Sequence, residues 1–352
     1  MPIRLVHVGV GVRGRHWLEI VAAHPDFVSV ACVDSSEEAF QKVRTLPGQD
    51  HGRFFTKLSD ALTQAAADAV LIATPTFLHP QHAIEALDAG LAVLVEKPLA
   101  PGLAEAVRVV ERSRAVSRPV MVAENYRFFR AERTLRQMIA SEALGRVHWA
   151  TCVDRRDQPS QTQGPWVKTM DHPFLTEIGV HHFDSFRYLF DRRPTSVFAL
   201  SYNPPGSDYE KEAAVAAVIE LDGGLPIQYG GTFAAARYEF ALWIEGSRGD
   251  LWTDRKRVWW RPRGGRFFRP CKFLPVPKGD ELPYPKAGTV SLLNQFRDAV
   301  IEGRTPETSA ADNLWTLAML EASVVSHREG RKVSVGEVFG PPMMQRAGLT
   351  VK

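Results

Sequence analysis

Short apolar runs rich in branched side chains alternate with segments of helical periodicity along the first 125 residues of the chain. The apolar runs are residues 3–9, 28–34, 69–75, 91–97 and 119–125. Strands that are apolar throughout, and that are separated by helices, are typical of a parallel sheet covered on both faces. The pattern therefore predicts an α/β N-terminal domain over residues 1–124.

After residue 125 the strand patterns begin to follow one another without helices between them. A helical segment and one strand pattern lead to a helix that begins near Thr176, and five strand patterns come next. They lie at residues 195–202, 213–221, 225–235, 239–246 and 257–262. An Asp-Gly-Gly turn at residues 222–224 predicts a hairpin between two of them. We therefore expect an antiparallel sheet in a second, α+β domain over residues 125–338, followed by a tail at 339–352.

Composition and charge exclude several classes of partner. Apolar residues make up 45% and charged residues 24% of the chain, as is ordinary for a globular protein. Because 43 basic residues stand against 40 acidic ones, the formal charge is only +3, and we expect neither nucleic acid nor a membrane as partner. Cys32, Cys152 and Cys271 have neither zinc-binding nor disulfide spacing, which favours a reducing compartment. With no signal peptide after Met1 and no apolar run near ~18 residues, the sequence predicts a cytoplasmic protein.

The first strand runs into a loop with G-x-G-x-x-G spacing. The loop precedes a predicted helix, and in that context its glycines let the backbone approach a pyrophosphate. Asp34 ends the second strand, where a carboxylate can bind ribose hydroxyls and would repel a 2′-phosphate, so NAD is favoured over NADP. Arg13 or Arg15 could offset that repulsion. The candidate cofactor contacts of this region are Gly9, Gly11, Val12, Arg13, Gly14, Asp34 and Ser35.

Two further loops leave the same predicted edge of the sheet. Ligands of open α/β sheets bind at the carboxyl ends of the strands, so both loops are candidate neighbours of the cofactor. Their candidate contacts are Thr74, Pro75 and His79 after one strand, and Glu96 and Lys97 after the next. A partly desolvated lysine beside a cationic nicotinamide could exchange a proton near neutral pH. Taken alone, Lys97 is better explained as a solvated lysine at a strand end, and His79 as an ordinary loop residue.

Taken in order, several motifs resemble those of the Gfo/Idh/MocA family of oxidoreductases. They are the glycine loop, ATPTFLHP (73–80), VEKP (95–98), NYRF (125–128), EIGVHHFD (177–184), GSRG (246–249) and the late segment 311–333. The resemblance spans almost the whole chain. It implies an NAD(P)-binding Rossmann domain, and a second domain whose open, mostly antiparallel sheet makes homodimer or homotetramer contacts. It also implies oxidation or reduction of a sugar, a sugar derivative or a cyclitol.

The same resemblance implies roles for individual residues. Lys97 matches the family's active-site lysine, and its bond to Pro98 is expected to be cis. The family pattern Asp-x-x-x-His-x-x-Asp is met here by Glu177, His181 and Asp184. His181 thus matches the catalytic histidine. Glu177 keeps the charge of the family's aspartate but adds a methylene, which can shift a hydrogen bond by about an ångström.

Helical geometry gives an independent view of the stretch TEIGVHHFD (176–184). A helix over residues 177–190 would place Glu177, His181, Asp184 and Tyr188 on one polar stripe. Gly179, Phe183, Phe186 and Phe190 would form the core face on the opposite side, so the His181 stripe would look away from the core. His182 lies about 100° round the helix from His181 and is expected to pack instead.

Three roles for His181 stay open at this point. A carboxylate one turn away can orient a histidine and raise its basicity, which favours acid/base catalysis. A metal site would need a further ligand such as Asp157 or Asp171, and we predict no metal. The third role is that of a structural histidine whose hydrogen bonds are satisfied.

The remaining candidates are polar or aromatic side chains near the two motifs. Tyr126, Arg127, Arg155 and Trp166, with Glu177 and His181, are the candidate substrate contacts. Solvated arginines and a packed tryptophan would fit the same pattern. The segment 259–272 interleaves arginines with aromatic residues, as nucleic-acid binders do, but a strand end and a solvated loop explain it better.

Together these features predict an NAD-dependent dehydrogenase that acts on a secondary hydroxyl. His181 would take the hydroxyl proton, Lys97 would polarise the same oxygen, and Glu177 would orient His181 or the substrate. Two alternatives remain. One is a lyase or glycoside hydrolase that oxidises its substrate transiently with bound NAD, and the other is a non-catalytic, nucleotide-sensing regulator.

Overall fold

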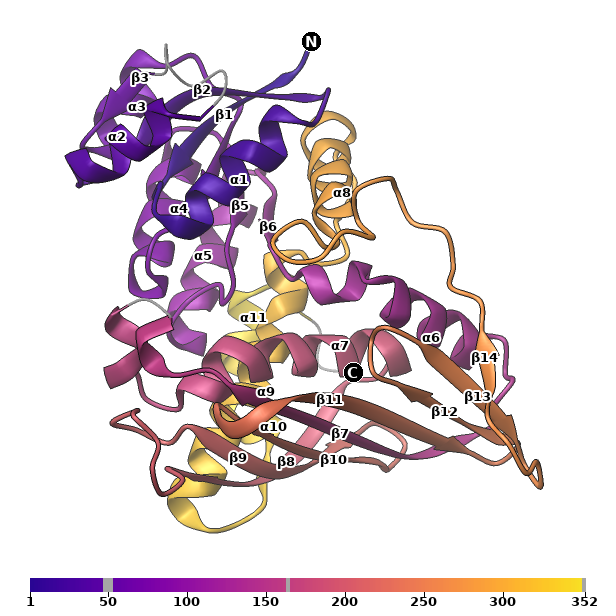
Figure 1. Ribbon diagram of the computed structural model, residues 1–352. Helices are drawn as coiled ribbons and strands as arrows, with labels where there is room; N and C mark the ends of the chain where they lie inside the picture. Colours follow the sequence, from indigo (N-terminus) through magenta and orange to yellow (C-terminus); the bar gives the residue numbers. More distant parts are fainter. Residues whose placement is uncertain (47–52, 163–164, 350–352) are drawn as a thin grey trace. The chain divides into compact units, whose positions relative to one another are not determined.

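The computed structural model describes residues 1–46, 53–162 and 165–349, which fold into two compact units (Figure 1). Unit 1 comprises Met1–Asn125, Pro277–Leu314 and Pro342–Lys352, and unit 2 comprises Tyr126–Val276 and Trp315–Pro341. The sequence suggests contiguous domains at 1–124 and 125–338 and a tail at 339–352. The two units are not contiguous, because two late segments of the chain pack with the N-terminal segment in unit 1. The ring of Phe296 stacks on Phe27 with centroids 6.3 Å apart, which ties a late helix to unit 1.

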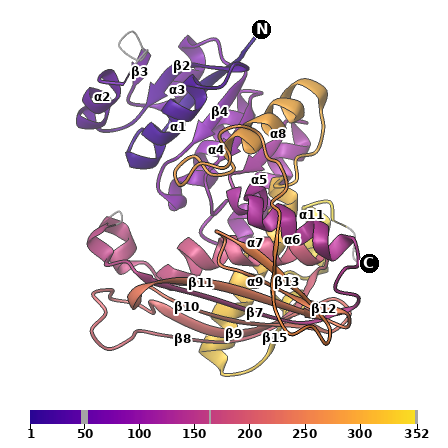
Figure 2. The ribbon, with the colours of Figure 1, turned by 45° about the vertical axis from the view of Figure 1, so that its right-hand side comes forward.

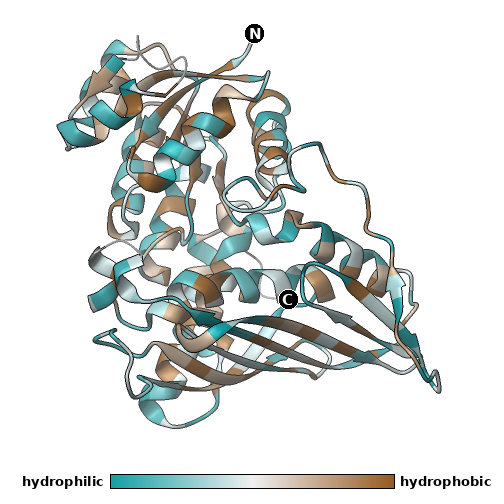
Figure 3. Ribbon diagram, in the orientation of Figure 1, coloured by the Kyte–Doolittle hydropathy of each residue, from teal (hydrophilic) through white to brown (hydrophobic). Residues whose placement is uncertain are grey.

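Unit 1 is built on a six-stranded parallel sheet in the order β3-β2-β1-β4-β5-β6. The strands are β1 Ile3–Val8, β2 Phe27–Val33, β3 Arg53–Phe55, β4 Ala69–Ile72, β5 Ala92–Val95 and β6 Val120–Val122. Strands β4 and β5 are buried at every position, which explains their unbroken apolar runs (Figure 3). The predicted parallel sheet is confirmed. Strand β3 was not predicted, because three residues give no measurable period.

Helices flank this sheet and complete unit 1. They are α1 Val12–Ala22, α2 Glu37–Arg44, α3 Leu58–Gln64, α4 His79–Asp88, α5 Leu103–Ala115, α8 Thr289–Glu302 and α11 Pro341–Arg346. The strand order reverses direction between β1 and β4, and in open α/β sheets ligands bind outside the strand ends at this switch point. The glycine loop follows β1 and the Thr74 loop follows β4, so both lie at the switch point.

Unit 2 is built on a nine-stranded sheet in the order β14-β13-β12-β11-β7-β10-β9-β8-β15. Neighbouring strands are antiparallel except for the parallel pair β7 and β10, so the predicted second sheet is confirmed as a mixed, mostly antiparallel one. The strands are β7 Val147–Asp157, β8 Pro194–Tyr202, β9 Ala214–Leu221, β10 Leu225–Thr232, β11 Ala234–Gly246, β12 Gly249–Thr253, β13 Val258–Pro262, β14 Arg269–Cys271 and β15 Val333–Ser334.

The helices of unit 2 cover one face of this sheet. They are α6 Arg130–Ala140, α7 Val180–Phe190, α10 Val335–Val338 and the part of α9 (Ala310–Glu329) that begins at Trp315. Helices α6 and α7 lie over the same face of the sheet (Figures 1 and 2). None of the helices among the described residues is long and apolar enough to cross a membrane.

The opposite face of the sheet is open and carries exposed apolar side chains. In β8, Phe198, Leu200 and Tyr202 are 48–56% exposed and alternate with buried neighbours. Further exposed apolar side chains of this sheet are Trp149 on β7, Val218 on β9 and Trp243 on β11. Alternation with a period of two places one set of side chains on each face of a strand. The outward set is here as apolar as the inward one.

Two adjacent glycines of β10 test this packing. A Cβ at Gly231 would lie 2.0 Å from the ring of Phe174, whereas a Cβ at Gly230 would meet no atom within 4 Å. We expect Gly231→Ala to lower the free energy of unfolding by about 1–3 kcal/mol through overpacking. Gly230→Ala is the matched control and should be neutral or slightly stabilising. Equal denaturation midpoints for the two variants would contradict the packing of Gly231 against Phe174.

Candidate active site

The three glycines of the loop after β1 differ in what a Cβ at each position would meet. Gly9 has φ +82°, and a Cβ there would lie 2.7 Å from the carbonyl oxygen of Ala73. A Cβ at Gly14 would lie 2.0 Å from the carbonyl oxygen of Gly9. A Cβ at Gly11 would meet no atom within 4 Å. Packing therefore requires two of the glycines, while the third leaves open space beside the start of α1.

The N-terminus of α1 suits an anion. Gly11 is the N-cap residue, no side chain of the described residues caps the helix, and its first turn holds no acidic residue. Uncapped N–H groups and the helix dipole favour a negatively charged group at this position. With the open space at Gly11, these features fit the pyrophosphate of a dinucleotide.

Asp34 lies beside the glycine loop, as predicted. Its Oδ2 accepts a hydrogen bond from Val10 N at 2.8 Å, and its Oδ1 accepts one from Ser36 N at 3.0 Å. A carboxylate has about four acceptor positions, so capacity for ribose hydroxyls remains. Of the other predicted contacts here, Val12 is 65% exposed and Ser35 is exposed too.

Glu96 links the glycine-loop helix to the end of β5. Its Oε1 accepts hydrogen bonds from Arg13 Nε at 2.5 Å and from Trp17 Nε1 at 2.7 Å, and its Oε2 accepts one from Lys97 N at 3.2 Å. Burial by itself would raise the pKa of Glu96, but the charge of Arg13 and these hydrogen bonds outweigh it and lower the pKa. The carboxylate therefore stays ionised and fixes the backbone at Lys97.

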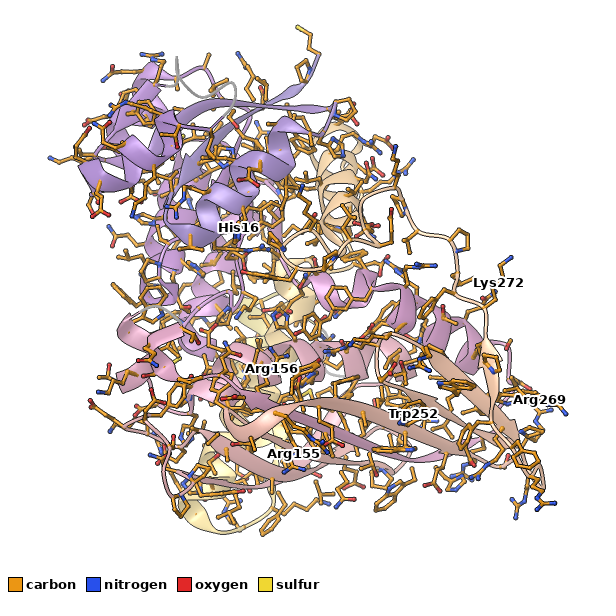
Figure 4. All side chains as sticks on the ribbon, in the orientation of Figure 1. His16, Arg155, Arg156, Trp252, Arg269 and Lys272 are labelled. Carbon is orange, nitrogen blue, oxygen red and sulfur yellow. The ribbon has the colours of Figure 1, made fainter. Side chains whose placement is uncertain are left out.

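Arg13 is engaged inside unit 1, which bears on its predicted role as a cofactor contact. Besides Glu96, its guanidinium lies over the rings of Trp17 and Tyr284, at 4.9 and 5.6 Å from their centroids. Tyr284 also meets the ring of His16 on α1, one of the side chains labelled in Figure 4. The structure thus gives Arg13 a position against Glu96, where it neutralises a buried carboxylate.

His79 joins the two loops that were predicted to approach the cofactor. Its Nδ1 lies 2.8 Å from the carbonyl oxygen of Pro98, and its Nε2 lies 2.8 Å from that of Thr74. Burial lowers the pKa of His79, while the two carbonyl oxygens oppose that shift. The side chain is 1% exposed, so the structure places it beneath the loops as a link rather than at their surface. Thr74 and Pro75 are half-buried, and the Lys97–Pro98 bond is cis, as expected.

In unit 2, the predicted polar stripe is not on a regular α-helix. Leu175–Gly179 forms a π-helical turn, and α7 begins only at Val180. Glu177 therefore belongs to the wider turn, and the i, i+4 geometry assumed between it and His181 does not apply. Single π-helical turns occur frequently at functional sites.

The expectation that the His181 stripe looks away from the core is also wrong. His181 is 7% exposed and Asp184 is 1% exposed, so both faces of α7 are buried. Arg127 donates from Nε to Asp184 Oδ2 at 2.5 Å and from a terminal nitrogen to Oδ1 at 2.6 Å. Arg127 was predicted to contact substrate, but this bidentate bond commits it to a buried carboxylate. A helical periodicity shows which positions are polar, not whether they face water or a buried partner.

Tyr126 contacts His181 directly. Their rings are stacked, with centroids 4.1 Å apart and an interplanar angle of 11°. The hydroxyl of Tyr126 accepts a hydrogen bond from Arg156 at 3.3 Å, and Arg156 donates two hydrogen bonds of 2.8 Å to Asp154. The structure thus brings Tyr126 and His181 together, as two of the predicted substrate contacts.

His182 packs in the core of unit 2, as its place on the helix predicted. Its Nδ1 lies 2.9 Å from the hydroxyl of Tyr229, and its Nε2 lies 3.2 Å from Asp154. Burial lowers the pKa of His182 to about 4, although Asp154 acts in the opposite direction. His182 is therefore neutral at physiological pH.

Arg155 and Trp166 do not accompany these residues. Figure 4 shows Arg155 and Arg156 leaving β7 on opposite sides. Arg155 pairs at 3.4 Å with Glu239, and its side chain is 55% exposed. Trp166 is 46% exposed in the short helical turn Pro165–Thr169. The basic segment 259–272 ends at the edge strand β14, where Figure 4 labels Arg269 and Lys272.

Sequence reasoning missed Asp154 and Arg156, and also Arg255, whose guanidinium carbon lies 4.1 Å from the ring centroid of Tyr126. The burial of Asp154 could have been predicted, because strand alternation places it on the same side of β7 as the buried Ala150 and Cys152. Arg255 lies in a turn of charged residues and gives no such signal. Among the described residues, no group of three His, Cys, Asp or Glu side chains could hold a metal ion.

Comparison with known proteins defines the class. Residues 3–124 match the oxidoreductase family with an NAD-binding Rossmann fold, and residues 133–252 match the GFO/IDH/MocA C-terminal domain. These matches define a family of oxidoreductases whose N-terminal domain is an NAD-binding Rossmann fold. The chain belongs to the Gfo/Idh/MocA family, and the resemblance seen in its motifs is confirmed.

Several named relatives cover nearly the whole chain. Myo-inositol 2-dehydrogenase of Thermotoga maritima is 23% identical, over 96% of this chain and 100% of the relative. D-apiose dehydrogenase of Paraburkholderia graminis is 26% identical, over 87% and 82% of the two chains. An oxidoreductase from Agrobacterium radiobacter, solved with NAD+, L-tartaric acid and magnesium, has the same fold, with a TM-score of 0.85 at 19% identity over 96% and 99%.

Gly11 allows a direct test of the dinucleotide site. Because its Cβ would enter open space and its φ is −62°, Gly11→Ala should leave the thermal stability unchanged. The added methyl would meet the approaching pyrophosphate, and we expect the Kd for NAD, measured by calorimetry, to rise about tenfold or more. Gly14→Ala, by contrast, should lower stability as well. Wild-type NAD affinity in Gly11→Ala would place the pyrophosphate elsewhere.

Proposed function

We propose that the protein is an NAD-dependent dehydrogenase that interconverts a secondary hydroxyl and a ketone on a sugar, a sugar derivative or a cyclitol. The observation that carries the proposal is the fixed position of Lys97 at the carboxyl edge of the dinucleotide-binding sheet. Glu96 holds its backbone on one side, and His79 holds the carbonyl of Pro98 on the other. A lysine held beside a nicotinamide site is suited to polarise an oxygen or to exchange a proton.

The proposed reaction divides the work among three side chains. NAD, when bound at the glycine loop, would supply the acceptor for the hydride of the carbinol carbon. His181 takes the proton of the hydroxyl, and Lys97 stabilises the negative charge that develops on the oxygen, which ends as a ketone. Glu177, which carries a carboxylate in the π-helical turn before α7, orients His181 or the substrate. In the reverse direction the same groups return the proton.

NAD is proposed over NADP because of Asp34. Its carboxylate is held beside the glycine loop by Val10 N, where it would accept from ribose hydroxyls and repel a 2′-phosphate. Arg13, which could have offset that repulsion, is engaged with Glu96. The substrate class is supported by the named relatives, which include dehydrogenases of inositol and of D-apiose.

A second function on the same fold is a lyase or glycoside hydrolase that oxidises its substrate transiently. It would release product without net formation of NADH. A third is a nucleotide-sensing regulator, which would bind NAD but turn over none of the polyols. An assay of sugars, cyclitols, sugar acids and keto-glycosides for NAD reduction and NADH oxidation separates the three.

The location and the assembly of the protein are also proposals. We propose the cytoplasm, since all three cysteines are free and Cys32 and Cys152 are buried. We propose a homodimer or homotetramer that buries the open face of the unit 2 sheet. The exposed Phe198, Leu200 and Trp243 on that face support the proposal, because contiguous apolar patches mark interaction sites.

Two substitutions test the assigned chemistry. We expect His181→Ala and Lys97→Ala each to lower kcat by roughly 10²–10⁴, the contribution typical of a general acid/base. Their Kd for NAD should stay near that of the wild type. His148→Ala and Lys42→Ala, at exposed positions, are the matched controls. Wild-type turnover in His181→Ala or Lys97→Ala would remove that residue from the mechanism.

The assembly can be tested on β8. Leu200 is 56% exposed on the open face, so Leu200→Glu would bury a charge in the proposed interface. We expect light scattering to give a smaller assembly for this variant than for the wild type. Ile301→Glu, at a 63% exposed apolar position of unit 1, should leave the mass unchanged. An unaltered mass for Leu200→Glu would argue against this face.

A further inference from the structure

Four planar side chains of unit 2 contact one another in a series that ends on His181. The guanidinium carbon of Arg255 lies 3.8 Å from the ring centroid of Phe240 and 4.1 Å from that of Tyr126. The ring of Tyr126 in turn stacks on the ring of His181, with centroids 4.1 Å apart and the planes nearly parallel. Arg255 therefore contacts the ring on which the proposed catalytic histidine rests.

The backbone at Arg255 is in an unfavourable conformation. Its φ is +65°, in the left-handed region that non-glycine residues rarely adopt. The turn around it is closed by side chains, because Thr253 Oγ1 accepts from Arg255 N at 2.9 Å and Asp254 Oδ1 accepts from Arg257 N at 2.7 Å. Strained residues that persist in a well-fixed turn cluster at functional sites.

The charge of Arg255 is matched inside the unit. Its Nε donates to Oε1 of Glu132 on α6 at 2.8 Å, and the two side chains are only 12% and 3% exposed. Burial by itself would lower the pKa of Arg255, but the charge of Glu132 reverses the direction and raises it. The guanidinium is thus held as a charged, planar group with no freedom to leave the stack.

Tyr126 is fixed at its hydroxyl as well as at its ring. Its hydroxyl accepts from Arg156, which Asp154 holds with two hydrogen bonds. The ring of Phe129 lies against it with centroids 4.7 Å apart. With ring contacts to Phe129 and Arg255 and a hydrogen bond at its hydroxyl, Tyr126 offers His181 a fixed platform.

We propose that Arg255 and Tyr126 are positioning residues that set the ring plane of His181. The inference rests on the proposed role of His181 as proton acceptor, and it assigns a task to a residue that no motif of the sequence marks. Proton transfer depends on the direction in which an imidazole nitrogen points, and a displacement of about 1 Å can lower turnover about 10²-fold. Lysine cannot replace Arg255, because an ammonium group has no plane to stack between two rings.

The test compares Arg255→Lys with Arg257→Lys, its matched control at an exposed position of the same turn. Histidine side chains are labelled for NMR, and the His181 signals are those missing from His181→Gln. In the wild type, the ring current of Tyr126 should shift the His181 signals upfield. Arg255→Lys should reduce that shift and lower kcat about 10–100-fold, while KM and the Kd for NAD stay near wild type. Arg257→Lys should change none of these values.

Two further variants separate folding from positioning. Arg255→Gln with Glu132→Gln removes both charges, so no buried carboxylate is left unpaired, and it should show the same loss. Tyr126→Leu should abolish the upfield shift of His181, and Tyr126→Phe should retain it.

Each outcome decides between the proposals. An unchanged His181 shift in a folded Arg255→Lys protein overturns the positioning role. A reduced shift with unchanged kcat shows that the ring plane of His181 does not limit turnover. That outcome overturns the positioning role and leaves the proposed function to the His181→Ala test. A reduced shift with a lowered kcat supports both.

Discussion

The buried ion pair between Arg127 and Asp184 is the interaction on which unit 2 depends. Helix α7 lies between the sheet and other helices, and side chains on both of its faces are excluded from water. A buried charge is tolerated only when a partner and further hydrogen bonds satisfy it. Arg127 supplies two hydrogen bonds to Asp184, and Thr316 of α9 donates a third at 3.2 Å. This one carboxylate therefore holds together the segment after β6, helix α7 and helix α9.

The same constraint shapes the region around His181. Asp154, Arg156, His182 and Tyr229 form one polar network in the interior, and Glu132 with Arg255 forms another beside it. Buried charges of this kind are costly unless a charge of opposite sign pairs with them. In the first network, Arg156 donates a hydrogen bond to the hydroxyl of Tyr126. In the second, the guanidinium of Arg255 lies over the Tyr126 ring. The rigidity that positions His181 thus arises from the need to pair buried charges.

In unit 1, a few hydrogen bonds of two buried side chains hold the loops at the edge of the sheet. Glu96 ties Arg13 and Trp17 of α1 to the backbone of Lys97, and His79 ties the Thr74 loop to Pro98. The loops at the edge of the sheet are therefore joined to one another beneath the surface. Loops carry function best when a rigid scaffold positions them. Gly11 is the place where this scaffold leaves the backbone open to a ligand.

Local patterns were sufficient for the parallel sheet, the antiparallel sheet and the glycine loop, and the family resemblance supplied the cis bond at Pro98. Unbroken apolar runs, period-two alternation and glycine spacing are short-range properties that the chain carries in itself. Only the tertiary structure decided that both faces of α7 are buried and that Arg127 pairs with Asp184. It also decided that Arg156, and not Arg155, forms the hydrogen bond to Tyr126. It placed residues 277–314 in unit 1 and Arg255 against the ring of Tyr126. The reason is that the sequence does not show whether a charged side chain is solvated or paired with a buried partner. That partner lies far away along the chain.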